Sequence, residues 1–186
     1  MKRIFDLIGA IFLLILFSVP MLVIALIIKG TSKGSILHVS DRVGINNSIF
    51  KMFKFRTMRT DTPAVATHLL ADPGTYLTPA GTFLRRFSLD ELPQLFNIIS
   101  GTMTFVGPRP ALFNQDDLIK LRTEKNIHKL IPGVTGWAQV NGRDSLPIPV
   151  KVEFDEYYLK NRSLSLDIRI MLMTIIKAAR GEGVQH

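Results

Sequence analysis

The chain has 186 residues, a formal net charge of +8 and a hydrophobic content of 47%. This length allows one domain with its own core. So positive a charge on so apolar a chain points to an anionic partner surface, such as anionic lipid or nucleic acid. The chain has no cysteine, which excludes disulfides and thiolate metal sites, and its four histidines lie too far apart in the sequence to form a ligand cluster. A structural zinc site is therefore not expected.

The N-terminus carries an uncharged, apolar run of 22 residues from Leu7 to Ile28. As a helix it would measure roughly 33 Å, just enough to span a hydrocarbon core of about 30 Å. Basic residues flank both ends, so the positive-inside bias draws both ends to the cytoplasm, and Pro20 removes a helical hydrogen bond midway. We therefore expect a re-entrant helical hairpin over residues 1–30, with Ser18 satisfying a carbonyl freed at the break. A proline-kinked spanning helix is the alternative, whereas a signal peptide fits poorly because no small-x-small cleavage site precedes Lys29.

The segment after this hairpin predicts two short strands. They cover residues 36–39 and 50–58, with a turn at residues 44–47 between them. In the second strand, aromatic residues alternate with Lys54 and Arg56, which predicts a half-buried strand with a solvated basic face and makes Arg56 a candidate phosphate ligand. Interleaved basic and aromatic residues also suit RNA, but the glycines of the RNP signature are missing, so nucleic-acid binding is not expected.

A carboxylate pair, Asp90 and Glu91, lies among arginines in the sequence LRRFSLDELPQLFNIISGTMTFVGPRP. Arg85 precedes the pair, and Arg109 follows it between two prolines that stiffen the backbone. Carboxylates among cations suit work on phosphate, because the arginines, with or without a divalent metal, give a diphosphate a place to dock. The same residues fit a helix cap, since Ser88-x-x-Glu91 matches a capping box and Asp90 would favour the positive helix end. On this stretch alone, the cap and the catalytic site are both open.

The helix predicted after the pair ends at Ser100-Gly101 and leaves Gln94 beside the pair on its open face. Upstream, residues 60–82 contain three prolines and predict a long loop. Downstream, residues 103–106 predict a strand that enters the rigid turn at Arg109. Asp155 adds an acidic group that could face the same site.

Two amphipathic helices are predicted in the C-terminal part of the chain. The first covers residues 116–130 and has Arg122 on its exposed face. The second covers residues 166–180, and its apolar face suits either the core or a membrane interface. Between them, residues 131–143 favour a hairpin around Trp137, with a nucleobase or membrane-edge contact as the functional alternative.

These motifs together resemble a known family. The apolar N-terminus is followed in order by FKFRTM, RRFSLDELPQLFN, FVGPRP, PGVTGWAQVNGR and a final amphipathic helix, six blocks that cover essentially the whole chain. They resemble the bacterial sugar transferases known as monotopic phosphoglycosyl transferases. The resemblance implies an α+β fold with a re-entrant membrane hairpin over residues 1–30. It also implies a small catalytic domain with short strands and interfacial helices over residues 31–186, on the cytoplasmic face of the bacterial inner (plasma) membrane.

The resemblance also implies an activity. Members of this family transfer a sugar 1-phosphate from a UDP-sugar to undecaprenyl phosphate, release UMP and need Mg²⁺. Carried onto this sequence, Asp90 is the nucleophile that forms a phosphosugar–aspartyl intermediate in a ping-pong cycle, and Glu91 helps to hold the metal. The likeness is to the minimal members of the family, which implies the first membrane step of capsule, O-antigen or glycoprotein glycan synthesis, with an N-acetylated deoxysugar as the expected donor.

Further site residues follow from the same resemblance. Arg85 and Arg109, with Arg56 assisting, would offset the charge of the diphosphate. Asp155 matches a later acidic position of the family and would orient Arg56 or the metal. The uridine-side wall of the site would include Pro132, Gly133 and Trp137.

The expected partners are the UDP-sugar, undecaprenyl phosphate and membrane lipids, without nucleic acid, while a homo-oligomer stays open. One alternative keeps the chemistry and takes UDP-glucose or UDP-galactose as donor. Another is a non-catalytic, membrane-tethered basic scaffold. The sequence does not identify the donor sugar, because its contacts would be scattered over loops such as residues 60–82.

Overall fold

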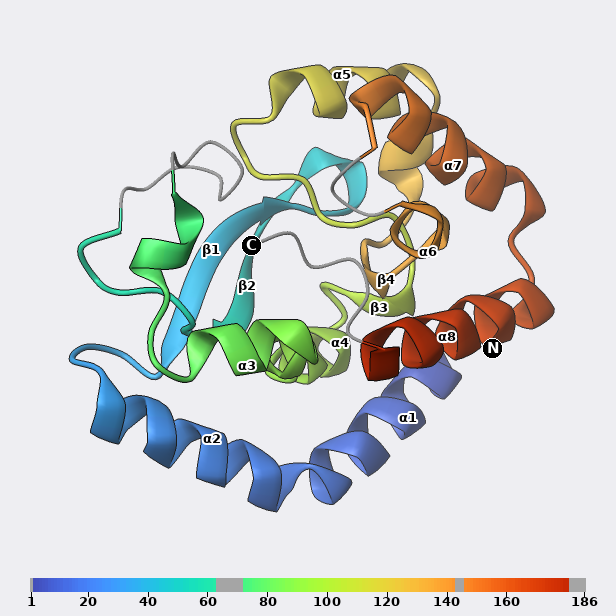
Figure 1. Ribbon diagram of the computed structural model, residues 1–186. Helices are drawn as coiled ribbons and strands as arrows, with labels where there is room; N and C mark the ends of the chain where they lie inside the picture. The colour runs from blue at the N-terminus through green and yellow to red at the C-terminus, as the bar shows by residue number, and fades with distance from the viewer. Residues whose placement is uncertain (1, 63–71, 143–145, 181–186) are drawn as a thin grey trace.

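The computed structural model describes residues 2–62, 72–142 and 146–180 (Figure 1). Helices predominate, and the strands of the described ranges form two separate two-stranded sheets, which confirms a mixed α+β fold. The helices are α1 Lys2–Leu16, α2 Ser18–Thr31, α3 Gly81–Arg86, α4 Gln94–Ser100, α5 Asp116–Glu124, α6 Trp137–Asn141, α7 Ile148–Asn161 and α8 Leu164–Arg180. The strands are β1 Leu37–Val43, β2 Ile49–Phe55, β3 Thr104–Val106 and β4 Gly133–Thr135. Short 3₁₀ helices are η1 Ile45–Asn47, η3 Pro73–Tyr76, η4 Leu89–Glu91 and η5 Ile127–Lys129.

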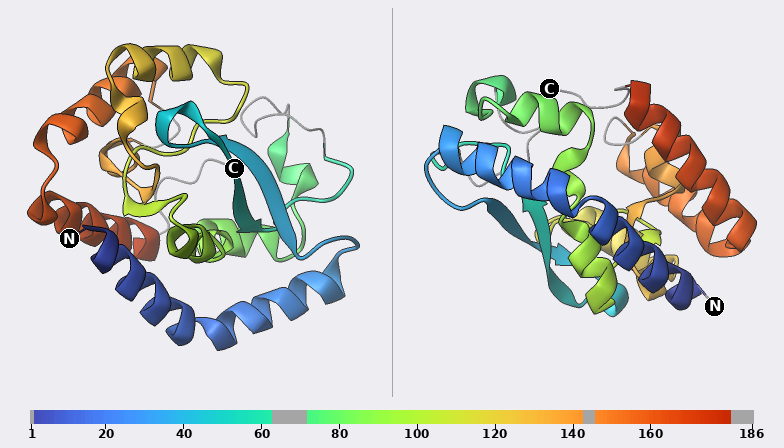
Figure 2. Two further views of the ribbon diagram at one scale, coloured as in Figure 1. Left: turned by 180° about the vertical axis from the view of Figure 1, so that it is seen from behind. Right: turned by 90° about the horizontal axis from the view of Figure 1, so that it is seen from below.

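The helices α1 and α2 form an open V along one side of the molecule (Figures 1 and 2). They bend by 61° at the break, and in the described part of the chain only this bent pair, and no single helix, has the length and apolarity to cross a membrane. The break falls at Phe17, and the Ser18 hydroxyl donates a hydrogen bond to the Ile15 carbonyl at 2.8 Å. The expected break and its local hydrogen bond are therefore confirmed, while re-entry into the membrane stays a prediction.

The two arms of the V have an inner face that packs on the rest of the protein and an outer face that does not. On the inner face, Ala10 packs with Leu95 and Ile98, and Ile28 packs with Phe55. On the outer face, several large apolar side chains are more than 60% exposed, among them Ile8, Phe12, Ile15, Val19 and Leu26. The V therefore packs on the globular part through its inner face and exposes an apolar surface on its outer face.

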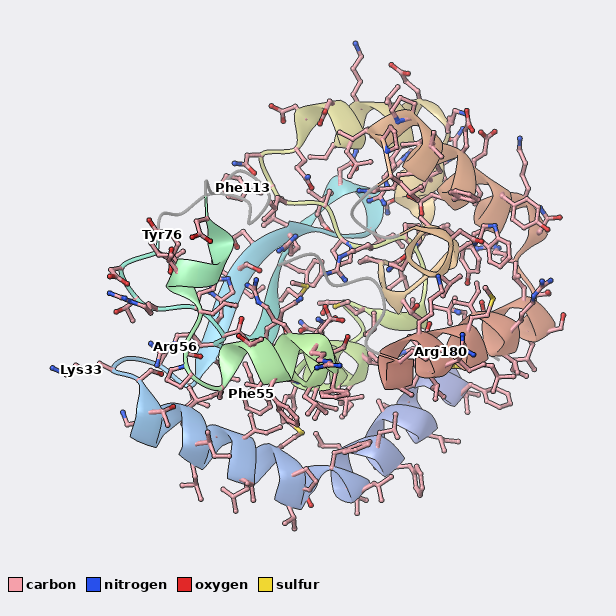
Figure 3. The ribbon with its side chains drawn as sticks, in the orientation of Figure 1. Lys33, Phe55, Arg56, Tyr76, Phe113 and Arg180 are labelled. Atoms are coloured by element: carbon pink, nitrogen blue, oxygen red, sulfur yellow. The ribbon has the colours of Figure 1, made fainter. Side chains whose placement is uncertain are left out.

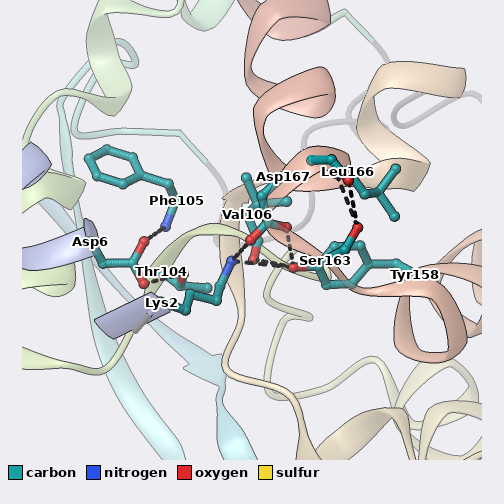
Figure 4. A network of polar contacts seen from close by, with 10 residues as sticks. Lys2, Asp6, Thr104, Phe105, Val106, Tyr158, Ser163, Leu166 and Asp167 are labelled. Carbon is teal, nitrogen blue, oxygen red and sulfur yellow. Dashed lines mark hydrogen bonds and ion pairs between the residues drawn. The ribbon is translucent and has the colours of Figure 1, made fainter. Parts of the chain in front are cut away.

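Polar contacts fasten α1 to the globular part (Figure 4). The buried Asp6 carboxylate accepts hydrogen bonds from the Thr104 hydroxyl at 2.6 Å and from a backbone N–H of β3 at 3.2 Å. Lys2 forms an ion pair with Asp167 of α8, and the Tyr158 hydroxyl donates to the same carboxylate at 2.7 Å. These contacts set the angle at which the apolar V leaves the domain, and the sequence pattern did not predict them.

The first sheet confirms the two predicted strands and the turn between them, although β1 continues to Val43 and β2 already ends at Phe55. β1 and β2 are antiparallel, with Leu37 opposite Phe55 and Val43 opposite Ile49, and η1 makes the turn between them. Of the predicted loop at residues 60–82, the part at 63–71 lies outside the described residues. The rest contains η3 and the start of α3.

The second sheet corrects the hairpin expected over residues 131–143. β4 pairs in parallel with β3, and α6 starts immediately afterwards at Trp137. The glycine at position 133, which suggested a turn, is explained by close packing of two backbones. A Cβ atom on Gly133 would lie 2.1 Å from the backbone nitrogen of Gly107. Glycine is needed here for the approach of two backbones, where the prediction took it for a turn.

The helix predicted over residues 116–130 is also corrected. α5 ends at Glu124 because Asn126 adopts a left-handed conformation with φ of 59°, and a short 3₁₀ turn follows. By contrast, α4 ends as predicted at Gly101, which has a φ of 87°. Arg122, which was expected on the exposed face of α5, is only 8% exposed.

Candidate active site

The carboxylate pair lies in η4, a single 3₁₀ turn between α3 and α4. Ser88 precedes this turn in a left-handed conformation, and its side chain makes no capping hydrogen bond to the described residues. Helix α4 starts later, with Pro93 as its N-cap, so Glu91 is outside the helix that it was predicted to cap. The capping-box interpretation is therefore wrong. Gln94, predicted on the open face, is only 1% exposed.

Packing on one side of η4 aims the two carboxylates at β2. Leu89 and Leu92 pack into the apolar cluster of α2 around Phe55. Asp90 and Glu91 turn toward β2, where the amine of Lys54 lies 2.6 Å from Glu91 Oε1 and 3.9 Å from Asp90 Oδ2. Asp90 is buried, with 8% of its surface exposed, so its environment is set by protein groups.

Three cations converge on the two carboxylates. Arg109 Nη2 lies 3.2 Å from the same Glu91 Oε1 that Lys54 contacts. Arg85 donates through Nε to the Thr57 hydroxyl at 2.9 Å, and its charge acts on Asp90. The sum of +3 from Lys54, Arg85 and Arg109 and −2 from the pair leaves the site with one excess positive charge. That balance suits an anionic ligand.

The two carboxyls have opposite ionisation tendencies. Burial opposes ionisation of Glu91, but the charges and hydrogen bonds of Lys54 and Arg109 outweigh it and lower the pKa to about 2. At Asp90 burial dominates, and together with the neighbouring Glu91 charge it raises the pKa despite the opposing cations. Environments that separate the pKa values of two adjacent acids assign them different roles. Glu91 therefore stays ionised at neutral pH, whereas the buried Asp90 carboxylate is poorly hydrated.

The pair can contribute to a divalent cation site, but it does not complete one. No set of three or more His, Cys, Asp or Glu side chains in the described ranges is arranged to hold a metal. Mg²⁺ is commonly held by one or two carboxylates together with waters and substrate phosphates. Two adjacent carboxylates match that ligand count, with phosphate oxygens and waters as the remaining ligands. Lys54 and Arg109 both contact Oε1 of Glu91.

Arg56, a predicted phosphate ligand, lies in a different place. Its guanidinium donates to the Ser32 carbonyl at 3.1 Å and hydroxyl at 2.8 Å, and also to the Lys33 carbonyl. Figure 3 shows Arg56 with Lys33 and Phe55 at the end of the molecule where α2 leads into β1. Gly34, with a φ of +115°, lets Arg56 approach, because a Cβ there would lie 2.8 Å from Nη1.

The solvated basic face expected on β2 is also wrong. The Lys54 side chain is 16% exposed, because it faces the carboxylates, and Arg56 is 6% exposed. Lys54 is the main site residue that the sequence reasoning missed. The alternation did place it on one face of the strand, but the pattern could not show that this face is covered.

Asp155 is brought to the site indirectly. It is 1% exposed and accepts hydrogen bonds from Arg122 Nε at 2.9 Å and Nη2 at 2.6 Å. Arg122 Nη1 donates in turn to the Arg109 carbonyl at 2.8 Å. The arginine that Asp155 orients is therefore Arg122 and not Arg56. Arg122 follows the buried Leu118 by four residues on one helix face, a signal that could have predicted its burial.

The predicted uridine-side wall lies partly beside the site. Gly133 donates its backbone N–H to the Pro108 carbonyl at 2.9 Å, and the Pro132 carbonyl accepts from Thr104 at 2.9 Å, so this segment borders the turn that holds Arg109. Trp137 instead stacks on Tyr157, with ring centroids 5.5 Å apart. It belongs to the contact between α6 and α7.

Comparison with known proteins agrees with the motif pattern. A family model described as bacterial sugar transferase matches residues 1–181. An uncharacterized sugar transferase, EpsL, from Bacillus subtilis is 40% identical over all of this chain and 91% of that protein. An undecaprenyl-phosphate glucose phosphotransferase from Komagataeibacter xylinus is 38% identical over 94% of this chain and 35% of its own length.

A third relative, from Aeromonas hydrophila, is a UDP-N-acetylgalactosamine-undecaprenyl-phosphate N-acetylgalactosaminephosphotransferase. It is 35% identical over 99% of this chain and 45% of its own length. The chain thus spans less than half the length of the two relatives whose names state a substrate. Those two names give different sugars.

Proposed function

Because the chain belongs to the bacterial sugar transferase family, we propose that it transfers a sugar 1-phosphate from a UDP-sugar to undecaprenyl phosphate and releases UMP. The observation that carries this proposal is the buried Asp90 carboxylate, held beside Glu91 in a site with one excess positive charge. Such a site supplies both a nucleophile and the cations that let an anionic nucleophile approach a diphosphate.

The proposed reaction has two displacements at one phosphorus atom. An Asp90 carboxylate oxygen attacks the sugar-side phosphorus of the UDP-sugar, the bond to the bridging oxygen breaks, and UMP leaves with that oxygen. A phosphate oxygen of the lipid then attacks the same phosphorus, and the bond to Asp90 breaks, which regenerates the carboxylate. The raised pKa of Asp90 supports this role, because a poorly hydrated carboxylate is a stronger nucleophile.

Glu91 and the cations divide the charge of the diphosphate between them. Glu91 would hold Mg²⁺ together with phosphate oxygens, and the metal would neutralise charge on the transferring group. Lys54, Arg85 and Arg109 surround the pair and would bind the remaining phosphate oxygens. Magnesium binding should therefore be weak without the nucleotide sugar and tighter with it.

The apolar outer face of the V supports attachment to the inner membrane from the cytoplasmic side. The exposed side chains of α1 and α2 would be buried in lipid, and basic residues at both ends would stay near the anionic surface. This arrangement brings a lipid phosphate to the same face as a soluble nucleotide sugar.

Donor-panel turnover tests the proposed function. Membranes containing the protein are incubated with undecaprenyl phosphate and, separately, an N-acetylated deoxysugar donor, UDP-glucose, UDP-galactose and UDP-N-acetylgalactosamine, and UMP is measured. We expect turnover with one donor class, the N-acetylated deoxysugar being the first choice. Asp90→Asn, which keeps the shape and removes the charge, should lower it by about a thousandfold or more. Turnover that survives this substitution would remove Asp90 as the nucleophile, and a non-catalytic scaffold would release no UMP with any donor.

A further inference from the structure

We infer that the buried ion pair of Arg122 and Asp155 is a positioning device that fixes Arg109 against Glu91. This role rests on the proposed transferase function and adds to it two residues that do not themselves touch the reacting groups. It also changes the role of Asp155 from a substrate-binding residue to one that acts through Arg122.

A continuous chain of contacts leads from α7 to the carboxylate pair. Asp155 on α7 accepts two hydrogen bonds from the Arg122 guanidinium on α5, at 2.9 and 2.6 Å. A third nitrogen of that guanidinium donates to the Arg109 carbonyl at 2.8 Å. The Arg109 side chain then reaches Glu91 Oε1 at 3.2 Å, where Lys54 also binds.

The contact to the Arg109 carbonyl completes the support of a short, rigid segment. Pro108 and Pro110 restrict the backbone on both sides of Arg109. The Pro108 carbonyl accepts from the backbone N–H of Gly133 at 2.9 Å, which ties the segment to β4. Arg122 ties the next carbonyl to α5 and α7, so the two peptide groups that flank Arg109 are held by different parts of the fold.

The burial of this ion pair argues for a role beyond holding two helices together. Arg122 is 8% exposed and Asp155 is 1% exposed, so both groups lose most of their hydration. A buried ion pair adds little stability over an apolar pair of similar size, but it fixes geometry because each donor needs its partner. Here the remaining Arg122 donor bonds the carbonyl of Arg109, whose side chain contacts Glu91.

The chain offers a matched control for this pair. Lys125, the C-cap residue of α5, forms a second ion pair with Glu156, the residue that follows Asp155 on α7, and this pair lies nearer the surface. Lys125 is 40% exposed and Glu156 is 23% exposed, and Glu156 also pairs with Lys160 along α7. If α5 and α7 only needed an ion pair to stay together, substitutions at the two pairs would have similar consequences.

The test compares Asp155→Asn and Arg122→Lys with the control variants Glu156→Gln and Lys125→Met. Each full-length protein is assayed in membranes for kcat, for KM of the UDP-sugar and for the Mg²⁺ concentration that gives half-maximal rate. The amount of UMP released without lipid acceptor counts the competent sites, so kcat refers to correctly folded molecules only. The thermal midpoint is measured in parallel.

For Asp155→Asn and Arg122→Lys we expect kcat to fall about 10- to 100-fold, because a small displacement of a catalytic cation is enough for such a loss. KM and the Mg²⁺ requirement should change much less, and the control variants should match the unmodified protein. In an Arg109→Lys background the two substitutions should have little further effect, because the residue that they position has already been replaced.

Three results would overturn the positioning role. Both substitutions could act like the controls. Their effects could persist in full in the Arg109→Lys background. Asp155→Asn could raise the Mg²⁺ requirement, which would make Asp155 a metal ligand. If the unmodified protein releases no UMP with any donor, the proposed function itself fails, and that outcome is distinct from these three.

Discussion

Lys54 and Arg56 lie two residues apart on and just after β2, yet they serve different regions of the molecule. The Lys54 amine meets Glu91 at 2.6 Å and Asp90 at 3.9 Å, so it belongs to the region around the carboxylate pair. Arg56 binds the Ser32 and Lys33 carbonyls, so it belongs to the region where α2 leads into β1. The difference shows that neighbouring cations on a strand can have different roles, because each role depends on the groups that pack against that side chain.

The chemistry of the two partners decides what each region can do. Lys54 faces carboxylates in a site that also holds Arg85 and Arg109. Its charge helps to lower the pKa of Glu91 and opposes the burial that raises the pKa of Asp90. Arg56 faces backbone carbonyls, which carry no charge and do not titrate. The first region can change charge state during a reaction, whereas the contacts of Arg56 hold the end of α2 to the start of β1.

Between these two regions, the largest expected effect is on catalysis, from Lys54→Met. This substitution keeps much of the side-chain volume and removes the charge that faces both carboxylates, so kcat should fall about 10²- to 10³-fold. UMP release per competent site measures it. A kcat within threefold or so of the unmodified protein would show that Lys54 is not part of the charge balance during transfer.

The next effect is on stability, from Arg56→Met. Two backbone carbonyls, of Ser32 and Lys33, would lose a buried charged donor, so the free energy of unfolding should fall by about 2–3 kcal/mol. The kcat of the molecules that remain folded should stay close to normal. Thermal unfolding measured alongside UMP release separates stability from kcat. A loss of kcat at an unchanged thermal midpoint would indicate that Arg56 binds phosphate.

The pH dependence sharpens the same comparison. The pKa of Asp90 is raised, so the ionised nucleophile is lost as the pH falls through that raised value, and kcat/KM should have an acidic limb above pH 3.8. Lys54→Met removes a charge that lowers this pKa, so the limb should move to higher pH. Glu91, with a pKa of about 2, should not add a second limb in this range. A limb that moves with Arg56→Met instead would contradict the separation of the two regions.

The lowered pKa of Glu91 also predicts how the stability of the folded protein depends on pH. A carboxyl whose folded pKa lies below its ordinary value of 4.5 stabilises the folded state above that pH, and this contribution is lost as the pH falls toward about 2. Glu91→Gln should remove this part of the acid sensitivity. Thermal midpoints of both proteins, measured at pH 6 and at the lowest pH that keeps the unmodified protein folded, would check it.

The smallest effect is expected from Lys51→Ala, a third cation on the same strand. Lys51 pairs with Asp41 across the sheet at 2.7 Å, and its side chain is 64% exposed. Exposed pairs of this kind contribute about 0.2–1 kcal/mol, so both stability and kcat should change little. A loss comparable to that of Lys54→Met would show that charge on this strand acts at a distance.

The features that the sequence predicted correctly depend on short, local patterns of residues. The adjacent acids at Asp90 and Glu91, the stiff turn around Arg109 and the helix break beside Ser18 need only neighbouring residues to be recognised. The structure places Arg109 on Glu91 and confirms a helix break, which lies at Phe17 beside Ser18. Local patterns are reliable where the backbone or the chemistry depends on residues that are adjacent in the chain.

The missed features depend on contacts between distant segments. Lys54 meets Glu91 across 37 residues, and Arg122 meets Asp155 across 33, so neither partnership leaves a local signal. Alternation placed Lys54 on one face of its strand but did not show what covers that face, and the helix prediction put Arg122 on the exposed face although it is buried. The glycine at Gly133 was ambiguous for the same reason, because a turn and a close approach of two strands both require glycine.

Trapping of the intermediate tests the central claim most directly. The protein in membranes is mixed with the UDP-sugar donor and Mg²⁺ but no lipid acceptor, quenched, digested and analysed by mass spectrometry. We predict release of about one equivalent of UMP and a sugar phosphate adduct on the peptide that contains Asp90, which disappears when undecaprenyl phosphate is added. Release of UMP only in the presence of the acceptor, with no adduct on that peptide, would contradict the covalent role of Asp90.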